Sequence, residues 1–144
     1  MKQLNPPHDQ DYEELEVDRF DLEKALECMY WMPLYVKRAE LSLLAAKQTL
    51  TKAEAIYEKH KNQTFLEADG RTANDKKAIS ELCLMNDQFE WEEAGEKKSC
   101  SYSELVEIAQ MDYSMALVHY HYQQNRKEEI IMRVSALKEQ MKKI

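Results

Sequence analysis

One stretch of the sequence gathers side chains that could contact a nucleic acid. Residues 119–127 read His-Tyr-His-Tyr-Gln-Gln-Asn-Arg-Lys, so rings, amides and two cations follow closely on one another. Proteins that bind single-stranded nucleic acid use this mixture: rings stack on bases, at roughly 1–3 kcal/mol each, and cations contact the backbone. His121, Tyr122 and Arg126 are the candidate contacts. A packed helix face and a protein-binding hot spot are the alternative interpretations, because Tyr120 also fits a buried position.

Residues suited to catalysis or metal binding do not cluster in this sequence. The two glycines, Gly70 and Gly95, form neither a phosphate-binding loop nor the strained turn of a serine nucleophile. His119 and His121 are two residues apart, whereas two metal ligands on one helix are three or four apart. Cys100 has no evident histidine or acid partner. We therefore predict that the protein is not an enzyme and needs neither a cofactor nor a metal.

The composition favours long helices with few connections. The chain has 144 residues, which fits one domain, and contains only two glycines and three prolines. A sandwich or a doubly wound sheet would need many more turn residues. Charged residues make up 33% and hydrophobic residues 44% of the sequence, as expected for helices with one apolar stripe.

A first apolar seam follows Pro33, with residues spaced alternately by three and four as in a coiled coil. Its members are Val36, Ala39, Leu43, Ala46, Leu50, Ala53, Tyr57 and His60, and Leu41, Leu44 and Ile56 are expected to widen it. Because proline is tolerated in the first turn of a helix, we predict that a new helix begins at Pro33. A short helix capped by Asp18 or Asp21 is predicted before it, and a break is predicted at residues 62–70.

A second, longer seam follows the capping sequence Ser101–Glu104. Its members are Val106, Ala109, Tyr113, Ala116, Tyr120, Gln123, Lys127, Ile130, Val134, Leu137, Met141 and Ile144. Between the two seams, a cap at Thr72–Asp75 predicts a shorter third helix through residues 78–85. In residues 86–100, Gly95 and the segment 97–99 are interpreted as a loop.

Together these elements predict an all-α fold. We expect a long antiparallel coiled-coil-like helical hairpin or a three-helix bundle, with a short N-terminal helix, over residues 18–144. Residues 1–17 are predicted to form a flexible acidic tail. The second seam is longer than the first, so its end at residues 130–144 lacks an internal partner. This excess predicts a homo-oligomer.

The net charge of −7 is unevenly distributed. Residues 34–61 carry six bases against three acids, and they include Lys37, Arg38, Lys47 and Lys52. This excess indicates either a solvated helix face or a surface for a polyanion.

The three cysteines are far apart, the first residues lack the apolar stretch of a signal peptide, and no apolar run approaches the roughly 20 residues of a membrane span. We therefore expect a cytoplasmic protein without membrane contact.

Two segments resemble a known class of phage proteins. Residues 53–59 (Ala-Glu-Ala-Ile-Tyr-Glu-Lys) end an Ala- and Lys-rich helix, and the segment Gly70–Ala78 precedes a long C-terminal helix. In outline, residues 33–144 resemble small helical phage proteins encoded near recombination genes, including UvsY-type recombination mediators. The resemblance implies an oligomer in the host cytoplasm that binds single-stranded DNA and loads a recombinase. By position, the implied DNA contacts are Lys37, Arg38, Lys47 and Lys52.

A different function fits the acidity of the chain. Polyphosphate affinity rises with the number of cations engaged, whereas this chain carries more acids than bases. The alternative is therefore an acidic helical protein–protein interaction module, or an anti-defence type of inhibitor, that binds a nucleic-acid-handling protein involved in recombination or defence.

Overall fold

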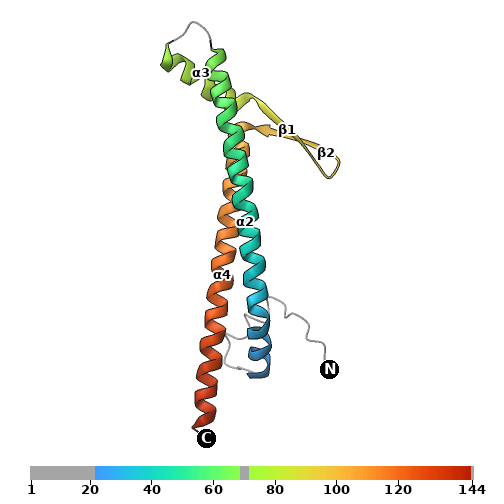
Figure 1. The fold of residues 1–144 in the computed structure, drawn as a ribbon, viewed down its shortest axis with the longest axis vertical. Helices are drawn as coiled ribbons and strands as arrows, with labels where there is room; N and C mark the ends of the chain where they lie inside the picture. Colours follow the sequence, from blue (N-terminus) through green and yellow to red (C-terminus); the bar gives the residue numbers. More distant parts are fainter. Residues whose placement is uncertain (1–21, 69–71, 144) are drawn as a thin grey trace. The chain divides into compact units, whose positions relative to one another are not determined.

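The computed structural model describes residues 22–68 and 72–143 (Figure 1). In chain order, its elements are helix α2 (Leu22–Glu67), helix α3 (Ala73–Asn86), strands β1 (Gln88–Glu93) and β2 (Glu96–Ser101), and helix α4 (Tyr102–Lys142). The predicted predominance of helix is confirmed, and a small two-stranded sheet is added to it. The predicted acidic tail, the caps at Asp18 and Asp21, and the seam residue Ile144 lie outside the described residues.

Helix α2 passes through Pro33, so the prediction that a new helix begins there is wrong. Proline has no N–H to donate to the carbonyl four residues earlier, and its ring crowds that carbonyl. The same heptad spacing nevertheless continues on the N-terminal side of the proline, through Leu22, Ala25, Met29 and Met32, all of them buried or half-buried. Burial on both sides of Pro33 therefore stabilises one continuous helix.

The end of α2 also differs from the prediction. The helix continues to Glu67, so the break predicted at residues 62–70 comes later than expected. Thr64 follows His60 by one more heptad step and is buried. Burial of this additional position explains why the helix does not stop at Asn62.

The chain divides into two compact units, and each contains part of α2 and part of α4. The first unit, called unit 1, includes residues 22–43 and 116–143. In it, Ala25, Cys28 and Met32 of α2 form one buried cluster with Ile130 and Val134 of α4. The apolar core of unit 1 therefore comes from residues on both helices.

The second unit, called unit 2, includes residues 44–68 and 72–115. Polar contacts join its elements: the His60 ring of α2 stacks on the Tyr102 ring of α4, with centroids 3.8 Å apart. His60 Nε2 also lies 2.8 Å from Asp87 Oδ2, at the C-terminal cap of α3. The buried Ser80 hydroxyl donates to the Lys61 carbonyl oxygen at 2.8 Å, which joins α3 to α2. These contacts join α2 to α3 and to the start of α4.

The two predicted helix caps that lie within the described residues both form. The Thr72 hydroxyl accepts a hydrogen bond from the Asp75 N–H at 3.3 Å, at the start of α3. The Ser101 hydroxyl accepts one from the Glu104 N–H at 3.1 Å, at the start of α4. Each bond satisfies a backbone donor that has no partner within its helix.

Residues 88–101 form an antiparallel hairpin, in which Gly95 lies in the turn, whereas the segment 97–99, interpreted as a loop, belongs to strand β2. Phe89 is the register partner of Cys100, and Trp91 that of Lys98. Ala94 and Gly95 connect the strands with φ angles of 51° and 81°. Two consecutive residues with positive φ are typical of the tight turn that matches the twist of paired strands.

The predicted seams coincide largely with the buried sides of the two helices. All eight residues of the first seam are buried or half-buried. In the second seam, the positions from Val106 to Leu137 are also buried or half-buried, whereas Met141 is exposed. Leu41 and Leu44 differ from expectation, because both are more than half exposed.

Candidate functional site

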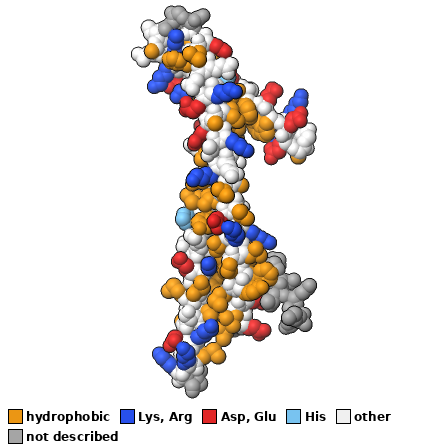
Figure 2. Space-filling model, viewed as in Figure 1, with side chains coloured by type: hydrophobic (Ala, Val, Ile, Leu, Met, Phe, Trp, Pro, Cys, Tyr) orange, Lys and Arg blue, Asp and Glu red, His pale blue; other side chains and the backbone are white. Residues whose placement is uncertain are grey.

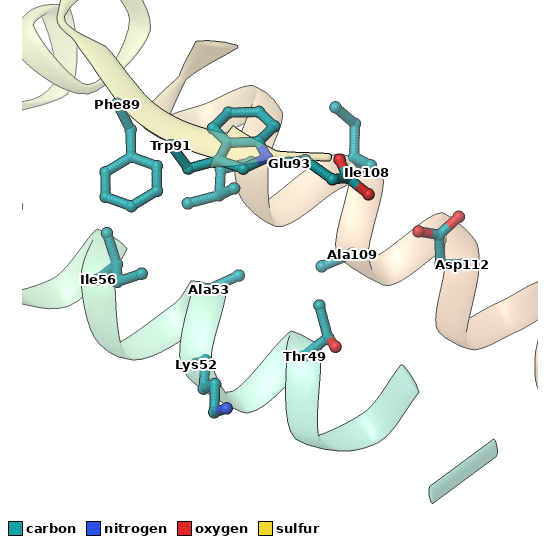
Figure 3. Close-up of a pocket in the computed structure, with 11 residues that line it drawn as sticks. Thr49, Lys52, Ala53, Ile56, Phe89, Trp91, Glu93, Ile108, Ala109 and Asp112 are labelled. Atoms are coloured by element: carbon teal, nitrogen blue, oxygen red, sulfur yellow. The ribbon is translucent and has the colours of Figure 1, made fainter. Parts of the chain in front are cut away.

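A groove of about 440 Å³ opens in unit 2 between strand β1 and helices α2 and α4 (Figure 3). We call it the hairpin groove. Its lining residues are Thr49, Lys52, Ala53 and Ile56 of α2, Phe89, Trp91 and Glu93 of β1, and Leu105, Ile108, Ala109 and Asp112 of α4. Hydrophobic side chains also reach the surface where the hairpin joins the helices (Figure 2).

Small seam residues and large strand residues together create this groove. Ala53 and Ala109 are buried seam residues whose single methyl groups leave space beside them. Phe89 and Trp91 are two apart on β1, so their side chains leave the same face of the strand. In Figure 3 the Phe89 ring points toward Ile56 of α2 and the Trp91 ring lies beside Glu93, and the centroids of the two rings are 6.1 Å apart. Aromatic rings therefore line the strand side of the groove, and the small residues Ala53 and Ala109 leave space on its helix side.

Charged groups surround this apolar surface. Lys98 on β2 donates a hydrogen bond of 3.0 Å to Glu93 Oε2. That bond, the positive charge of Lys98 and a further hydrogen bond with Trp91 lower the pKa of the Glu93 carboxyl below its usual value. Glu93 is therefore ionised at neutral pH. Asp112 on α4 supplies a second carboxylate and Lys52 on α2 supplies a cation.

The lining residues are suited to binding. They include no histidine, cysteine or serine, and the pKa of Glu93 is shifted away from the range of a general acid at neutral pH. Within residues 22–68 and 72–143, no group of three or more His, Cys, Asp or Glu side chains could hold a metal ion. An indole beside two carboxylates favours a cationic group that carries apolar carbon atoms.

The candidate cations of α2 lie on exposed parts of the helix. Lys37, Arg38, Lys47 and Lys52 are all exposed, and Lys52 also lines the hairpin groove. The guanidinium carbon of Arg38 lies 5.9 Å from the centroid of the Tyr35 ring. Lys37 Nζ is 3.8 Å from Glu40 Oε2, which is a weak surface contact.

The candidate contacts of α4 differ from one another in exposure. His121 and Tyr122 are exposed, but Arg126 is only 6% exposed. The Arg126 guanidinium lies over the Tyr122 ring at 5.6 Å and its Nη1 is 3.7 Å from Glu129. A base could therefore reach the rings of His121 and Tyr122 directly, whereas Arg126 would have to leave its present contacts to reach a phosphate.

The aromatic side of the groove was missed at the sequence level. Phe89, Glu90, Trp91 and Glu92 alternate between apolar and acidic residues, which is the pattern of a strand with one covered face. The dipeptide Ala94–Gly95 then separates this run from the next one by two residues, the commonest hairpin spacing. Both signals were present, but Gly95 and the segment 97–99 favoured the interpretation as a loop.

No helix in the described parts of the chain is long and apolar enough to cross a membrane. No protein-family model matches the sequence, and comparisons with curated proteins and with solved structures give no match.

Proposed function

We propose that this protein is a non-enzymatic helical interaction protein, and that its hairpin groove binds a segment of a partner protein containing basic and apolar residues. The observation that carries the proposal is the half-buried Trp91 in an open groove flanked by the carboxylates of Glu93 and Asp112. Aromatic residues in partly desolvated pockets supply much of the binding energy at protein interfaces.

The charges of the groove select the class of partner. Lys98 pairs with the Glu93 carboxylate, so Asp112 is the carboxylate of the lining that can attract a basic side chain. Lysine and arginine combine an apolar stem with a cationic head, so each can place its stem on the Trp91 ring and its head near a carboxylate. Nucleic-acid-handling proteins have basic surfaces, and a partner from that class fits this chemistry.

The proposal includes a scaffold in which α2 and α4 pair as an antiparallel coiled-coil-like hairpin. Packing of the two helices within unit 1 supports this pairing, through the cluster of Met32, Ile130 and Val134. In unit 2, His60 contacts Tyr102 at one end, whereas Ala53 and Ala109 share the groove further along both helices. The order of these contacts is that of antiparallel helices.

A peptide-binding experiment tests the groove. The probes are two fluorescently labelled peptides of equal length, one alternating leucine with lysine or arginine, the other alternating leucine with glutamate. We expect anisotropy to show binding of the basic peptide alone, and we expect Trp91→Ala to weaken it by at least about tenfold. Asp112→Asn should weaken it less and reduce its salt dependence.

Met85→Ala is the matched control, because Met85 is an exposed apolar residue of α3 outside the groove lining. Equal binding of the basic and acidic peptides, or equal affinity of Trp91→Ala and the wild type for the basic peptide, would refute the proposal.

Binding of single-stranded DNA is a second candidate function, and the exposure of Lys37, Arg38, Lys47 and Lys52 favours it. Together with the resemblance to UvsY-type mediators, this exposure supports an oligomeric recombination mediator. The test is anisotropy of a labelled single-stranded oligonucleotide over a range of salt concentrations. Changing Lys37, Arg38 and Lys47 together to alanine should lower the logarithmic salt slope by about 2, since each single-strand phosphate contact contributes about 0.7.

The control for this triple variant has the same change of charge elsewhere. Lys138, Lys142 and Lys143 are exposed near the end of the described chain, and their joint replacement by alanine also removes three cations. An identical salt slope for the two triple variants would show that DNA does not contact α2 through these residues.

A further inference from the structure

The hairpin groove adjoins a second pocket of about 260 Å³, which we call the end pocket. The two share Ile56 and Phe89, and both lie entirely within unit 2. The rings of Phe89 and Tyr102, with centroids 5.8 Å apart, form the aromatic wall of the end pocket. Its lining residues are Ile56, Lys59, His60 and Gln63 of α2, Phe89 of β1 and Tyr102 of α4.

Both helices place the end pocket at the same end of the groove. On α2, residues between 49 and 56 line the groove, and residues between 56 and 63 line the end pocket. On α4, residues between 105 and 112 line the groove, and Tyr102 lines the end pocket. The end pocket therefore lies at the end of the groove that is farthest from Asp112.

The Asp112 end of the groove is negatively charged. The other carboxylate of the lining, Glu93, is paired with Lys98 on β2 at 3.0 Å. In Figure 3, Asp112 lies at the end of the groove away from Phe89, and the Lys52 amine points away from strand β1. Asp112 is therefore the group at this end that a basic side chain can pair with.

The end pocket has the opposite chemistry. Lys59 is exposed and supplies a cation, and the exposed carboxamide of Gln63 supplies N–H donors. His60 Nε2 lies 2.8 Å from Asp87 Oδ2, and Asp87 is outside the lining of the end pocket. An acidic side chain fits these groups, because a carboxylate accepts hydrogen bonds from both an ammonium and an amide.

We propose that the hairpin groove and the end pocket together bind one extended segment of the partner protein. Its basic residue lies at Asp112, its acidic residue lies at Lys59, and its apolar residues cover Trp91 between them. This inference rests on the proposed function of the groove and adds an acidic residue at a defined spacing. Charges of opposite sign at the two ends fix the register of the segment, since a shifted segment leaves both of its charges unpaired.

The length of the groove sets the spacing of the two charges. Lys59 is next to His60, whose ring stacks on Tyr102, so Tyr102 marks the level of Lys59. Tyr102 and Asp112 are ten positions apart on α4, which corresponds to about 15 Å at about 1.5 Å per residue. An extended chain advances about 3.3 Å per residue, so the acidic residue is expected about five positions from the basic one.

Anisotropy with labelled peptides and the full-length chain tests the second charge. The peptides have blocked termini and carry one lysine and, five positions away, a glutamate, a glutamine or a second lysine, with leucine and serine alternating between them. Each is made in both chain directions, and the tighter-binding direction is compared. We expect the glutamate peptide to bind about two- to fivefold more tightly than the glutamine peptide, the range of one exposed ion pair. Moving the glutamate next to the lysine should remove this gain.

Lys59→Glu reverses the charge of the end pocket. In this variant the peptide with two lysines should bind more tightly than the glutamate peptide, the opposite of the order in the wild type. Lys77→Glu is the matched control, because Lys77 is exposed on α3 and lies outside both linings. It makes the same change of charge in the same unit and should keep the order of the wild type. Circular dichroism verifies the helix content of both variants.

Equal affinity of the glutamate and glutamine peptides for the wild type would overturn the proposal. So would the same order of affinities in Lys59→Glu and Lys77→Glu. In either case, weaker binding of the basic peptide by Trp91→Ala would leave the proposed function of the groove intact. Basic-peptide binding that does not depend on Trp91 would refute the proposed function, and the two-charge segment with it.

Discussion

Replacement of Val134 by aspartate tests the core of unit 1. Val134 is 2% exposed and belongs to the cluster of Ala25, Cys28, Met32 and Ile130. Removing two methyl groups from this site, as in Val134→Ala, should cost about 1.6 kcal/mol of transfer free energy at 0.8 kcal/mol per group. The cavity left behind raises the cost to about 2–2.5 kcal/mol.

Aspartate adds a second and larger penalty at the same position. The neighbouring side chains of the cluster are apolar or a thiol, so a carboxylate there would lose its hydration without a cationic partner. Burying an uncompensated charge costs several kcal/mol, and the total is then comparable with the 5–15 kcal/mol stability of a typical domain. We expect Val134→Asp to open unit 1.

Urea unfolding followed by circular dichroism measures the effect, and hydrogen exchange locates it. Val134→Asp should lose amide protection in residues 22–43 and 116–143. The control is Ser135→Asp, which adds the same charge at the next position, where the side chain is exposed, and should change stability by less than about 0.5 kcal/mol. If both variants unfold at the same urea concentration as the wild type, the assignment of Val134 to a buried core is wrong.

Four further outcomes are expected. Leu43→Asp should destabilise the protein less than Val134→Asp, because Leu43 is only half-buried, and urea midpoints compare the two. Ala94→Asn should stabilise the hairpin by up to about 1 kcal/mol and slow its hydrogen exchange, because asparagine tolerates the positive φ of 51° better than alanine does. Faster hydrogen exchange in this variant would contradict the turn geometry. Ser80→Ala should cost about 1–2 kcal/mol in urea unfolding, because it removes the bond to the Lys61 carbonyl, whereas Glu81→Ala on the exposed face should be neutral. Burial, and secondarily the charge of Glu104, raise the pKa of the Cys100 thiol, so alkylation at pH 8 followed by mass spectrometry should label Cys83 before Cys100. The raised pKa also links stability to pH: the protonated Cys100 thiol contributes fully to stability below the pKa that the thiol has in the unfolded chain, and this contribution is lost as the pH rises through the pKa in the folded protein.

Heptad spacing predicted the sides of the helices that are buried, because side-chain burial along a helix follows its periodicity directly. The positions around Val36 and Val106 illustrate this, since both lie on the less exposed side of their helix. The caps at Thr72 and Ser101 were predictable for a similar reason, because each hydroxyl accepts a hydrogen bond from a backbone N–H only three residues later in the sequence.

The continuation of α2 through Pro33 could not be predicted from this residue alone. Proline is compatible with the first turn of a helix and costs about 3 kcal/mol or more inside one, so local propensity favours a boundary. Burial of Ala25 and Met32 before it, together with the continuing heptad, offsets that cost. The outcome depends on contacts with residues far away in the sequence, such as Ile130, which local propensity does not include.

The hairpin groove depends on the same kind of distant contact. The alternation at Phe89 and Trp91 was visible in the sequence, but only the fold shows that this strand face meets Ala53 and Ala109. Alanine at a seam position has two possible consequences: close approach of two helices, or space for a third element. In unit 2 the aromatic face of β1 lies beside that space, and the volume left between strand and helices is the groove.

Helix α4 shows why periodicity alone does not identify an interface. A spacing of three and four fits the seam through Tyr113 and equally a second set through Met115, because the two sets are related by a shift of two residues; the second set is Ile108, Met111, Met115, Val118 and Tyr122. Pattern matching finds whichever set is longer, and the seam is longer. Exposure then distinguishes the two, because the seam side chains from Val106 to Leu137 are buried or half-buried, whereas those of the second set are exposed.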